Sequence, residues 1–199
     1  ISSAQVLPPQ LENLFPFFHH RVKLLKSKLE ATMPQEVTAQ SLIDLPLAES
    51  WKKLRDISLA HHYVPGIVKT EIVSEHKEGV GASRYVYRTE KSYIQETVEE
   101  WQEGSGFLIR LHKGDKSAPP FKNAWFRYKL SDHGDGKTQF TASLTYEMPW
   151  GRLGAWLGAR MQNFVQATIA DVALSMKLYY ETGDPTTRET LKAYKARAR

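Results

Sequence analysis

Apolar residues recur every three or four positions over residues 149–183, which is the longest run of helical periodicity in the chain. Side chains with this spacing share one face of an α-helix, so the run predicts a long C-terminal helix. Gly183 precedes Asp184 and Pro185, an order typical of a helix end. A coiled coil is the alternative, but the stripe is too wide and aromatic for a strict heptad. The predicted stripe consists of Leu153, Leu157, Met161, Phe164, Thr168, Val172, Met176 and Tyr179.

The chain before this helix alternates between apolar and polar residues in short segments, a pattern that predicts β-strands. Short links, many containing glycine, join these segments, so neighbouring strands should pair as antiparallel hairpins. Residues 48–57 predict a short helix after the first strand, and residues 61–66 predict a second short helix or a tight loop. The expected strands cover residues 36–45, 67–76, 83–89, 93–101, 107–112, 123–130 and 138–148.

Alternation also assigns each strand position to one of the two faces of the sheet. The last expected strand is the clearest, because large apolar residues and small polar residues alternate through its whole length. In the strand 93–101, the apolar positions Ile94 and Val98 place Glu96 on the inner face between them. The other inner residues should include Phe107, Ile109, Phe126, Tyr128, Phe140, Leu144 and Tyr146.

The strand 83–89 allows two orientations, with either its arginines or its tyrosines facing inward. We expect the arginines inward, because a three-residue loop at 89–91 sets Arg84 opposite Glu96. A buried carboxylate needs a partner of opposite charge. In the alternative orientation, Tyr85 and Tyr87 belong to the core and Arg84 is solvated. The first orientation turns Arg84, Val86 and Arg88 inward.

Pattern and charge divide the chain into three parts. Residues 1–34 form an N-terminal amphipathic helical extension, residues 35–183 one domain, and residues 184–199 a basic C-terminal tail. The net charge of +5 lies in the two flanks, whereas the domain carries equal numbers of acidic and basic residues. The stretch 11–30 is either an interfacial helix for an anionic membrane surface or an extra helix packed on the domain.

Composition excludes several classes of protein. Without cysteine, the chain has no disulfide, thiolate metal site or cysteine nucleophile. It has no apolar run long enough to span a membrane, and a neutral domain argues against a nucleic-acid interface. We expect no metal and no cofactor. The expected location is cytoplasmic, with membrane association left open, since the chain starts at Ile1 and what precedes it is unknown.

The order of elements and several short motifs resemble the SRPBCC superfamily, which includes START-like domains and polyketide cyclase/dehydrase-like proteins. The resemblance covers about residues 36–182. Tyr63 stands where the family usually has tryptophan. The motifs are Ile43-Asp44-Leu45-Pro46 with Glu49-Ser50-Trp51, Leu54 and Asp56; Tyr63-Val64-Pro65-Gly66; Gly79-Val80-Gly81 with Arg84; Glu96; and Gly151-Arg152-Leu153-Gly154.

This resemblance implies an α+β helix-grip fold, with a curved antiparallel sheet of about seven strands gripping the long C-terminal helix and two short helices after the first strand. It also implies a hydrophobic cavity between the sheet and that helix, closed at one end by the short helices. The ligand would be a lipid, a quinone or a polyketide-like molecule. The expected ligand-binding residues are Arg84, Glu96, Phe126, Tyr128, Leu144, Tyr146, Met161, Phe164, Thr168 and His62.

Three functions fit this reading. The first is binding or carriage of a hydrophobic small molecule without catalysis. The second is a polyketide cyclase or dehydratase that uses a cavity acid or base such as Tyr146 or His62. The third is a membrane-peripheral adaptor anchored by residues 11–30. The first is favoured, because the sequence contains no motif for catalysis and no catalytic residue can be assigned. Oligomeric state is open.

Two further groups of residues have simple structural explanations. Glu99 and Glu100 are adjacent on an expected strand and should face opposite ways, so with Glu103 they are better explained as a solvated edge than as an acid–base pair. Gly154 and Gly158 fit the G-x-x-x-G pattern in a stretch too polar for a membrane dimer. Close packing of the helix on the sheet explains them better.

Overall fold

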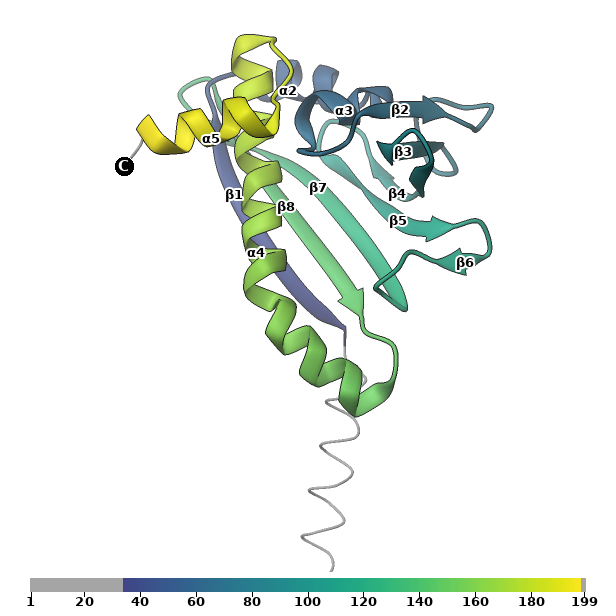
Figure 1. Ribbon diagram of the computed structural model, residues 1–199. Helices are drawn as coiled ribbons and strands as arrows, with labels where there is room; N and C mark the ends of the chain where they lie inside the picture. The colour runs from purple at the N-terminus through teal and green to yellow at the C-terminus, as the bar shows by residue number, and fades with distance from the viewer. Residues whose placement is uncertain (1–33, 198–199) are drawn as a thin grey trace, which may run out of the picture.

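A computed structural model describes residues 34–197 as a curved antiparallel sheet with helices on one face (Figure 1). The expected helix over residues 11–30 lies outside the described residues. The strands are β1 (Gln35–Ile43), β2 (Lys69–Ile72), β3 (Ser83–Thr89), β4 (Ser92–Gln102), β5 (Gly106–Lys113), β6 (Lys116–Ser117), β7 (Asn123–Gly134) and β8 (Lys137–Glu147). The helices are α2 (Leu47–Leu54), the 3₁₀ turn η2 (Ile57–Leu59), α3 (Ala60–Tyr63), α4 (Gly151–Thr182) and α5 (Arg188–Arg197).

The sheet has eight strands in the order β1-β8-β7-β5-β4-β3-β2, with the short β6 paired to β5. All pairs are antiparallel, as the short links predicted. The helix-grip architecture expected from the sequence is therefore confirmed. The strand predicted at 83–89 agrees with β3 at both ends, whereas β7 runs four residues past the predicted end. The hairpin ladder between β7 and β8 continues through polar positions that the apolar pattern could not show.

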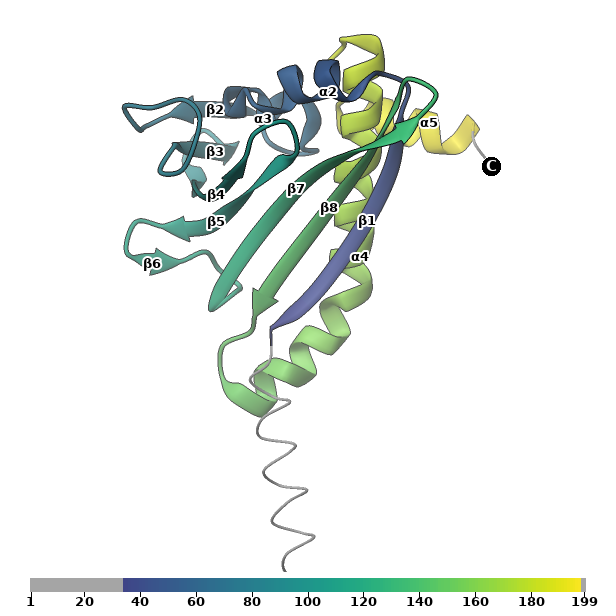
Figure 2. The same ribbon diagram turned by 180° about the vertical axis from the view of Figure 1, so that it is seen from behind.

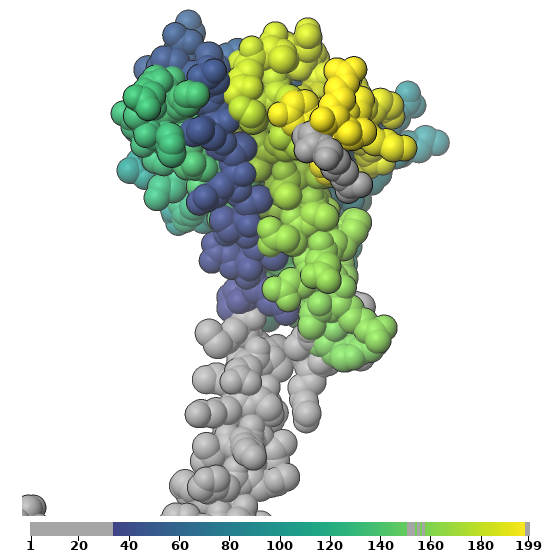
Figure 3. All heavy atoms as spheres, turned by 90° about the vertical axis from the view of Figure 1, so that its left-hand side faces the viewer, coloured from purple at the N-terminus to yellow at the C-terminus, as the bar shows by residue number. Residues whose placement is uncertain are grey.

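The long helix α4 lies along β1 and β8, and the strands β2 to β5 curl away from it (Figure 1, Figure 2). Figure 3 shows β1 and α4 side by side on one face, with α5 beside the upper half of α4. α4 ends where the sequence predicted. Gly183 adopts a left-handed conformation with φ 81°, and its N–H donates to Tyr179 O at 2.9 Å. Such a C-terminal glycine satisfies a carbonyl that the helix leaves unpaired.

The buried face of α4 agrees with the predicted stripe only in part, at Val172 and Met176. Phe164 is 70% exposed and Thr168 is also exposed, although both belong to that stripe. The helix packs along the β1 edge of the sheet, so a neighbouring set of positions is turned inward. Both sets repeat every three or four residues, and periodicity alone could not choose between them. The side chains buried on α4 are Val165, Ile169, Val172, Ala173, Ser175, Met176 and Tyr180.

Residues 184–199 were predicted to be a separate basic tail, but most of them form α5, which packs on the domain. Leu191 of α5 is only 4% exposed. The linker is also fixed, because Thr186 N–H donates to His62 O at 2.8 Å and its hydroxyl donates to Ser175 O at 3.1 Å. Leu191 is the one buried side chain of this charged helix, and so isolated an apolar contact was too weak a pattern to predict the docking.

The glycine pair of α4 also has a packing role. A side chain at Gly154 would collide with the backbone of Pro149, and one at Gly158 would meet the side chains of Gln35 and Met148. The close approach predicted from G-x-x-x-G is confirmed. Its partner is the β8–α4 link and the start of β1 rather than the middle of the sheet.

A β-bulge changes the predicted faces of β4. The register shifts between Val98 and Glu100, so Glu99 and Glu100 both lie on the outer face. Glu99 accepts a hydrogen bond of 2.8 Å from Trp125 Nε1, and Glu100 pairs with Arg127 at 2.8 Å. The extra residue of the bulge broke the simple alternation that had placed these carboxylates on opposite faces.

Candidate functional site

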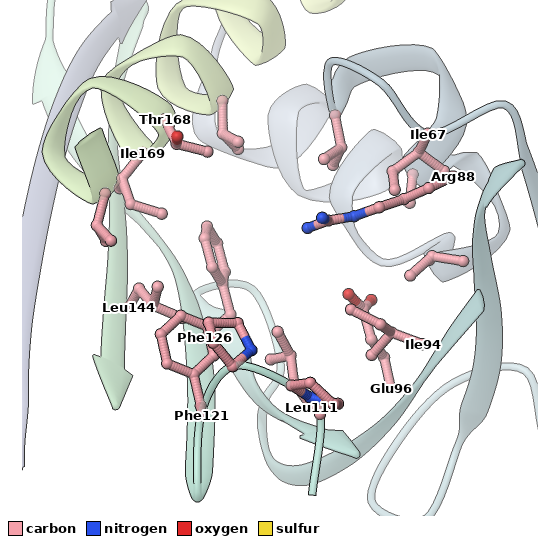
Figure 4. Close-up of a pocket in the computed structure, with 18 of the residues that line it drawn as sticks. Ile67, Arg88, Ile94, Glu96, Leu111, Phe121, Phe126, Leu144, Thr168 and Ile169 are labelled. Carbon is pink, nitrogen blue, oxygen red and sulfur yellow. The ribbon is translucent and has the colours of Figure 1, made fainter. Parts of the chain in front are cut away.

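A cavity of about 210 Å³ lies between α4 and the part of the sheet that curls away from it. Its walls come from four regions that are distant in sequence, and most of its lining is apolar (Figure 4). The sheet contributes Val86, Ile94, Leu111, Phe126 and Leu144; the β6–β7 link contributes Ala118 to Phe121; the α3–β2 region contributes Ala60, Val64 and Ile67; and α4 contributes Met161, Phe164, Val165, Ile169 and Val172.

Four side chains bring polar groups to this apolar wall among the described residues: Arg88, Glu96, Tyr128 and Thr168. The guanidinium of Arg88 and the carboxylate of Glu96 both point into the cavity (Figure 4). They come from β3 and β4, whose inner faces the alternation had identified. An apolar cavity with a few convergent polar groups is the usual form of a small-molecule site.

The Glu96 carboxylate is held by a buried arginine behind the cavity wall. Arg84 Nε donates to Glu96 Oε2 at 2.7 Å, Nη2 lies 2.6 Å from the same oxygen, and Nη1 donates to Ile57 O. Burial is the largest single effect on Arg84 and disfavours its charge, but the Glu96 carboxylate together with the nearby Tyr63 and Tyr128 raises the arginine pKa overall. The orientation in which the arginine side faces inward is confirmed, since Arg84 is fully buried opposite Glu96.

Neutral phenols surround this ion pair. Burial raises the pKa of Tyr128 well above its ordinary value, and nearby Tyr63 adds to that effect. The ring of Tyr63 lies 6.3 Å from the rings of both Tyr128 and Tyr180. The hydroxyls of Tyr63 and Tyr180 are buried and have no hydrogen-bond partner among the described residues. These phenols can therefore donate hydrogen bonds but carry no charge at neutral pH.

The cavity opens beside Arg88 into a wider groove of about 800 Å³, which we call the vestibule. Its walls are the α3–β2 link, one side of α4 and the facing side of α5. The cavity and the vestibule share the side chains of Val64, Ile67, Arg88, Phe164, Thr168 and Val172. The two spaces are therefore adjacent, and the exposed Phe164 lies between them.

The structure brings together most of the residues expected at the site. Arg84 lies directly behind the wall. Tyr146 and His62 do not line the cavity. Tyr146 is buried and its hydroxyl donates to Gln35 Oε1 at 2.8 Å. The lining does include Glu96, Phe126, Tyr128, Leu144, Met161, Phe164 and Thr168.

The imidazole of His62 lies on the side of α3 away from the cavity. Its Nδ1 is 3.1 Å from the hydroxyl of Tyr179, which belongs to α4. The neighbouring His61 has a pKa lowered by desolvation and then by the nearby His62. His62 therefore connects α3 to α4. A helix of only four residues offered no sequence signal for which side would face the cavity.

Sequence reasoning missed several residues that line the cavity. Arg88 had been placed inward by alternation but not named as a site residue. Ala118 and Phe121 flank two prolines in a link whose sequence predicts a turn. The apolar character of that short stretch, between charged residues, was the available signal.

Two other kinds of site can be assessed within residues 34–197. No cluster of three or more histidine, aspartate or glutamate side chains there could hold a metal ion. None of the described helices is both long enough and apolar enough to cross a bilayer.

A comparison with protein families identifies the family of this chain. A family model described as polyketide cyclase / dehydrase and lipid transport matches residues 34–181. No curated protein sequence matches the chain.

Solved structures give similar folds at low sequence identity. Ara h 8.0201 has a TM-score of 0.55 at 19% identity, covering 74% of this chain and 97% of its own. A protein of Nitrosospira multiformis has a TM-score of 0.59 at 13% identity, covering 75% and 98%. A protein of Thermus thermophilus has a TM-score of 0.57 at 18% identity, covering 73% and 97%. At these identities the likeness extends to the fold alone.

Proposed function

The chain belongs to the polyketide cyclase/dehydrase and lipid-transport family, and on that basis we propose that it binds and carries a hydrophobic small molecule. The lipid, quinone or polyketide-like ligand would place its apolar part in the cavity between α4 and the sheet. The observation that carries this proposal is the apolar cavity itself, which lies between the sheet and α4 and opens beside Arg88.

The residues that line the cavity are better suited to orienting a ligand than to catalysing a reaction on it. Removing apolar surface from water contributes roughly 25 cal/mol per Å², so an apolar wall favours an apolar guest. The polar groups at Arg88, Glu96 and Tyr128 can then fix the orientation of that guest by hydrogen bonds. Because the cavity is smaller than the pockets of about 300–1,000 Å³ that hold drug-sized ligands, it suits one apolar arm of a molecule.

An enzymatic role of the cyclase or dehydratase type receives less support. His62 and Tyr146, the acid and base candidates from the sequence, lie away from the cavity. Glu96 is the only carboxylate that lines it among the described residues, and Arg84 already engages that carboxylate. A general base needs free access to the proton that it removes. The neutral phenol of Tyr128, like the guanidinium of Arg88, could act here as a hydrogen-bond donor rather than as a base.

Titration with a neutral fluorescent probe tests the proposal. N-phenyl-1-naphthylamine should gain fluorescence on binding to the full chain, and decanol should displace it. A native mass spectrum of the purified protein should also show a co-purifying apolar molecule. Absence of probe binding, with no bound molecule in the spectrum, would overturn the carrier role.

A further inference from the structure

The vestibule beside the cavity is strongly cationic. Four basic side chains line it: Arg88 from β3, and Arg188, Lys192 and Lys195 from α5. Asp171 of α4 is the one carboxylate in its lining, and it forms an ion pair with Lys195. Three cations thus remain without an ion-pair partner among the described residues. A cleft lined by one sign of charge focuses its electric field and raises the local concentration of ligands of opposite charge.

The cations lie close to the mouth of the apolar cavity. Arg88 lines both spaces, and its guanidinium points into the cavity in Figure 4. Arg188 lies against Gly66, where any side chain would collide with its guanidinium. Gly66 also has φ 87°, a conformation that other residues rarely adopt. Local geometry at the α3–β2 link therefore leaves room for Arg188 at this position.

Helix α5 supplies most of this charge, and it lies beyond the family match that ends at residue 181. Arg188 and Lys192 are four residues apart, so they share one side of the helix. Leu191 anchors α5 on the domain beside them. The neighbouring Glu189 does not line the vestibule. Hydrogen bonds to its own backbone and to Thr187 lower the pKa of that carboxyl.

We infer that the vestibule binds the anionic headgroup, of phosphate type, of an amphiphile whose apolar part occupies the cavity. This inference rests on the proposed carrier function and adds to it the chemical class of the ligand. The apolar cavity is too small for a whole lipid, and a cationic groove lies beside it. Together the two spaces fit a molecule with one apolar arm and a charged end. Arginine and lysine are the usual partners of phosphate oxygens.

Matched ligands test the inference on the full chain. Decyl phosphate and decanol share an alkyl chain and differ in the headgroup, and both are used below micelle-forming concentrations. Displacement of N-phenyl-1-naphthylamine should show that decyl phosphate binds about tenfold more tightly than decanol, as expected for about three exposed ion pairs acting together. Raising the salt concentration should reduce this preference, because exposed charges are screened.

Substitutions localise the effect. The Arg188→Gln, Lys192→Gln double variant should lose most of the preference for decyl phosphate while binding decanol as before, because neither side chain lines the cavity. Lys129→Gln removes an exposed cation from the outer side of β7 and should leave the preference unchanged. Circular dichroism and a thermal melt check that all variants are folded.

The outcomes separate the headgroup from the cavity. Equal binding of decyl phosphate and decanol would overturn the headgroup site and leave the carrier role intact. Failure of both ligands to bind would overturn both proposals. Inorganic phosphate serves as the third ligand. If it bound as tightly as decyl phosphate, the vestibule would be a site for free anions, and the link between headgroup and cavity would be overturned.

Discussion

Arg84 and Glu96 face each other across β3 and β4, with Arg84 Nε donating to Glu96 Oε2 at 2.7 Å. The arginine side chain is 1% exposed and the glutamate 12%. Loss of one partner from a buried pair leaves the other charge without compensation. This pair therefore holds the cavity wall and the η2 turn in place relative to each other, because the Ile57 carbonyl of that turn also accepts a hydrogen bond from Arg84.

Glu96→Gln should lower the free energy of unfolding by about 3 kcal/mol, because Arg84 would remain buried without a carboxylate. Denaturant unfolding measures the change. Glu71→Gln breaks the exposed pair with Lys69 and should have little effect. Combining Glu96→Gln with Arg84→Met should recover part of the loss, since both charges are then removed. A Glu96→Gln variant as stable as wild type would contradict the structural role of the pair.

Thr168→Phe should block uptake of the neutral probe while leaving the melting temperature almost unchanged. Thr168 is exposed and lines the cavity beside Phe164, so a larger side chain covers the mouth without overpacking the core. Ala170→Phe is the matched control, because this exposed position of α4 does not line the cavity. Probe affinity that is equal in both variants would show that ligand does not pass this point.

Glu103 should contribute a pH-dependent part of the stability. Its carboxylate accepts hydrogen bonds from Trp51 Nε1 at 2.9 Å and Trp101 Nε1 at 3.0 Å, and these bonds lower its pKa, with Arg55 adding a smaller effect. A lowered pKa in the folded state gives stability that is complete above the unfolded value of about 4.3. That stability is lost as the pH falls through the folded-state pKa.

Glu103→Gln should accordingly lower the stability at pH 7, and the difference from wild type should close as the pH drops below about 4. Urea unfolding at a series of pH values measures this difference. Glu90→Gln, at an exposed turn, is the control, and its stability should equal that of the wild type at every pH. A constant difference at every pH would mean that charge on Glu103 plays no part.

Leu191→Ala should release α5 from the domain. Truncation of a buried leucine removes roughly 2 kcal/mol or more of packing, which is a large share of the contact of one short helix. Hydrogen exchange should show faster amide exchange over residues 188–197, with β7 and β8 unchanged. Tyr194→Ala truncates an exposed apolar side chain of the same helix and should leave its protection intact. Unchanged protection in Leu191→Ala would contradict the docking.

The release of α5 also bears on the ligand. Because α5 carries Arg188, Lys192 and Lys195, Leu191→Ala should reduce the preference for decyl phosphate over decanol. Binding of the neutral probe should persist, since the cavity walls come from other elements. Loss of neutral-probe binding as well would mean that α5 supports the cavity itself.

Much of the candidate site was predictable because strand alternation reports which side chains share a face. Phe126, Tyr128 and Leu144 meet at the cavity for that reason. The length of the β3–β4 loop and the need of a buried carboxylate for a partner predicted the pairing of Arg84 with Glu96. Tyr146 shares the inner face of β8 with Leu144, yet it lies beyond the cavity and packs against Phe121. The two-residue repeat of a strand predicts which face of the sheet a side chain occupies. It does not predict where along that face a cavity lies.

The sequence by itself determined the order of the main elements, the antiparallel pairing and the end of α4 at Gly183, and it favoured the inward side of β3 that the structure has. These features follow from local periods and turn residues, which act over a few positions of the chain. Only the tertiary structure decided which of two adjacent stripes α4 buries, that a bulge turns Glu99 and Glu100 to the same face, and that α5 docks beside the cavity mouth. Each of these depends on how surfaces distant in sequence fit together, because the volume left between elements is set by all of their side chains at once.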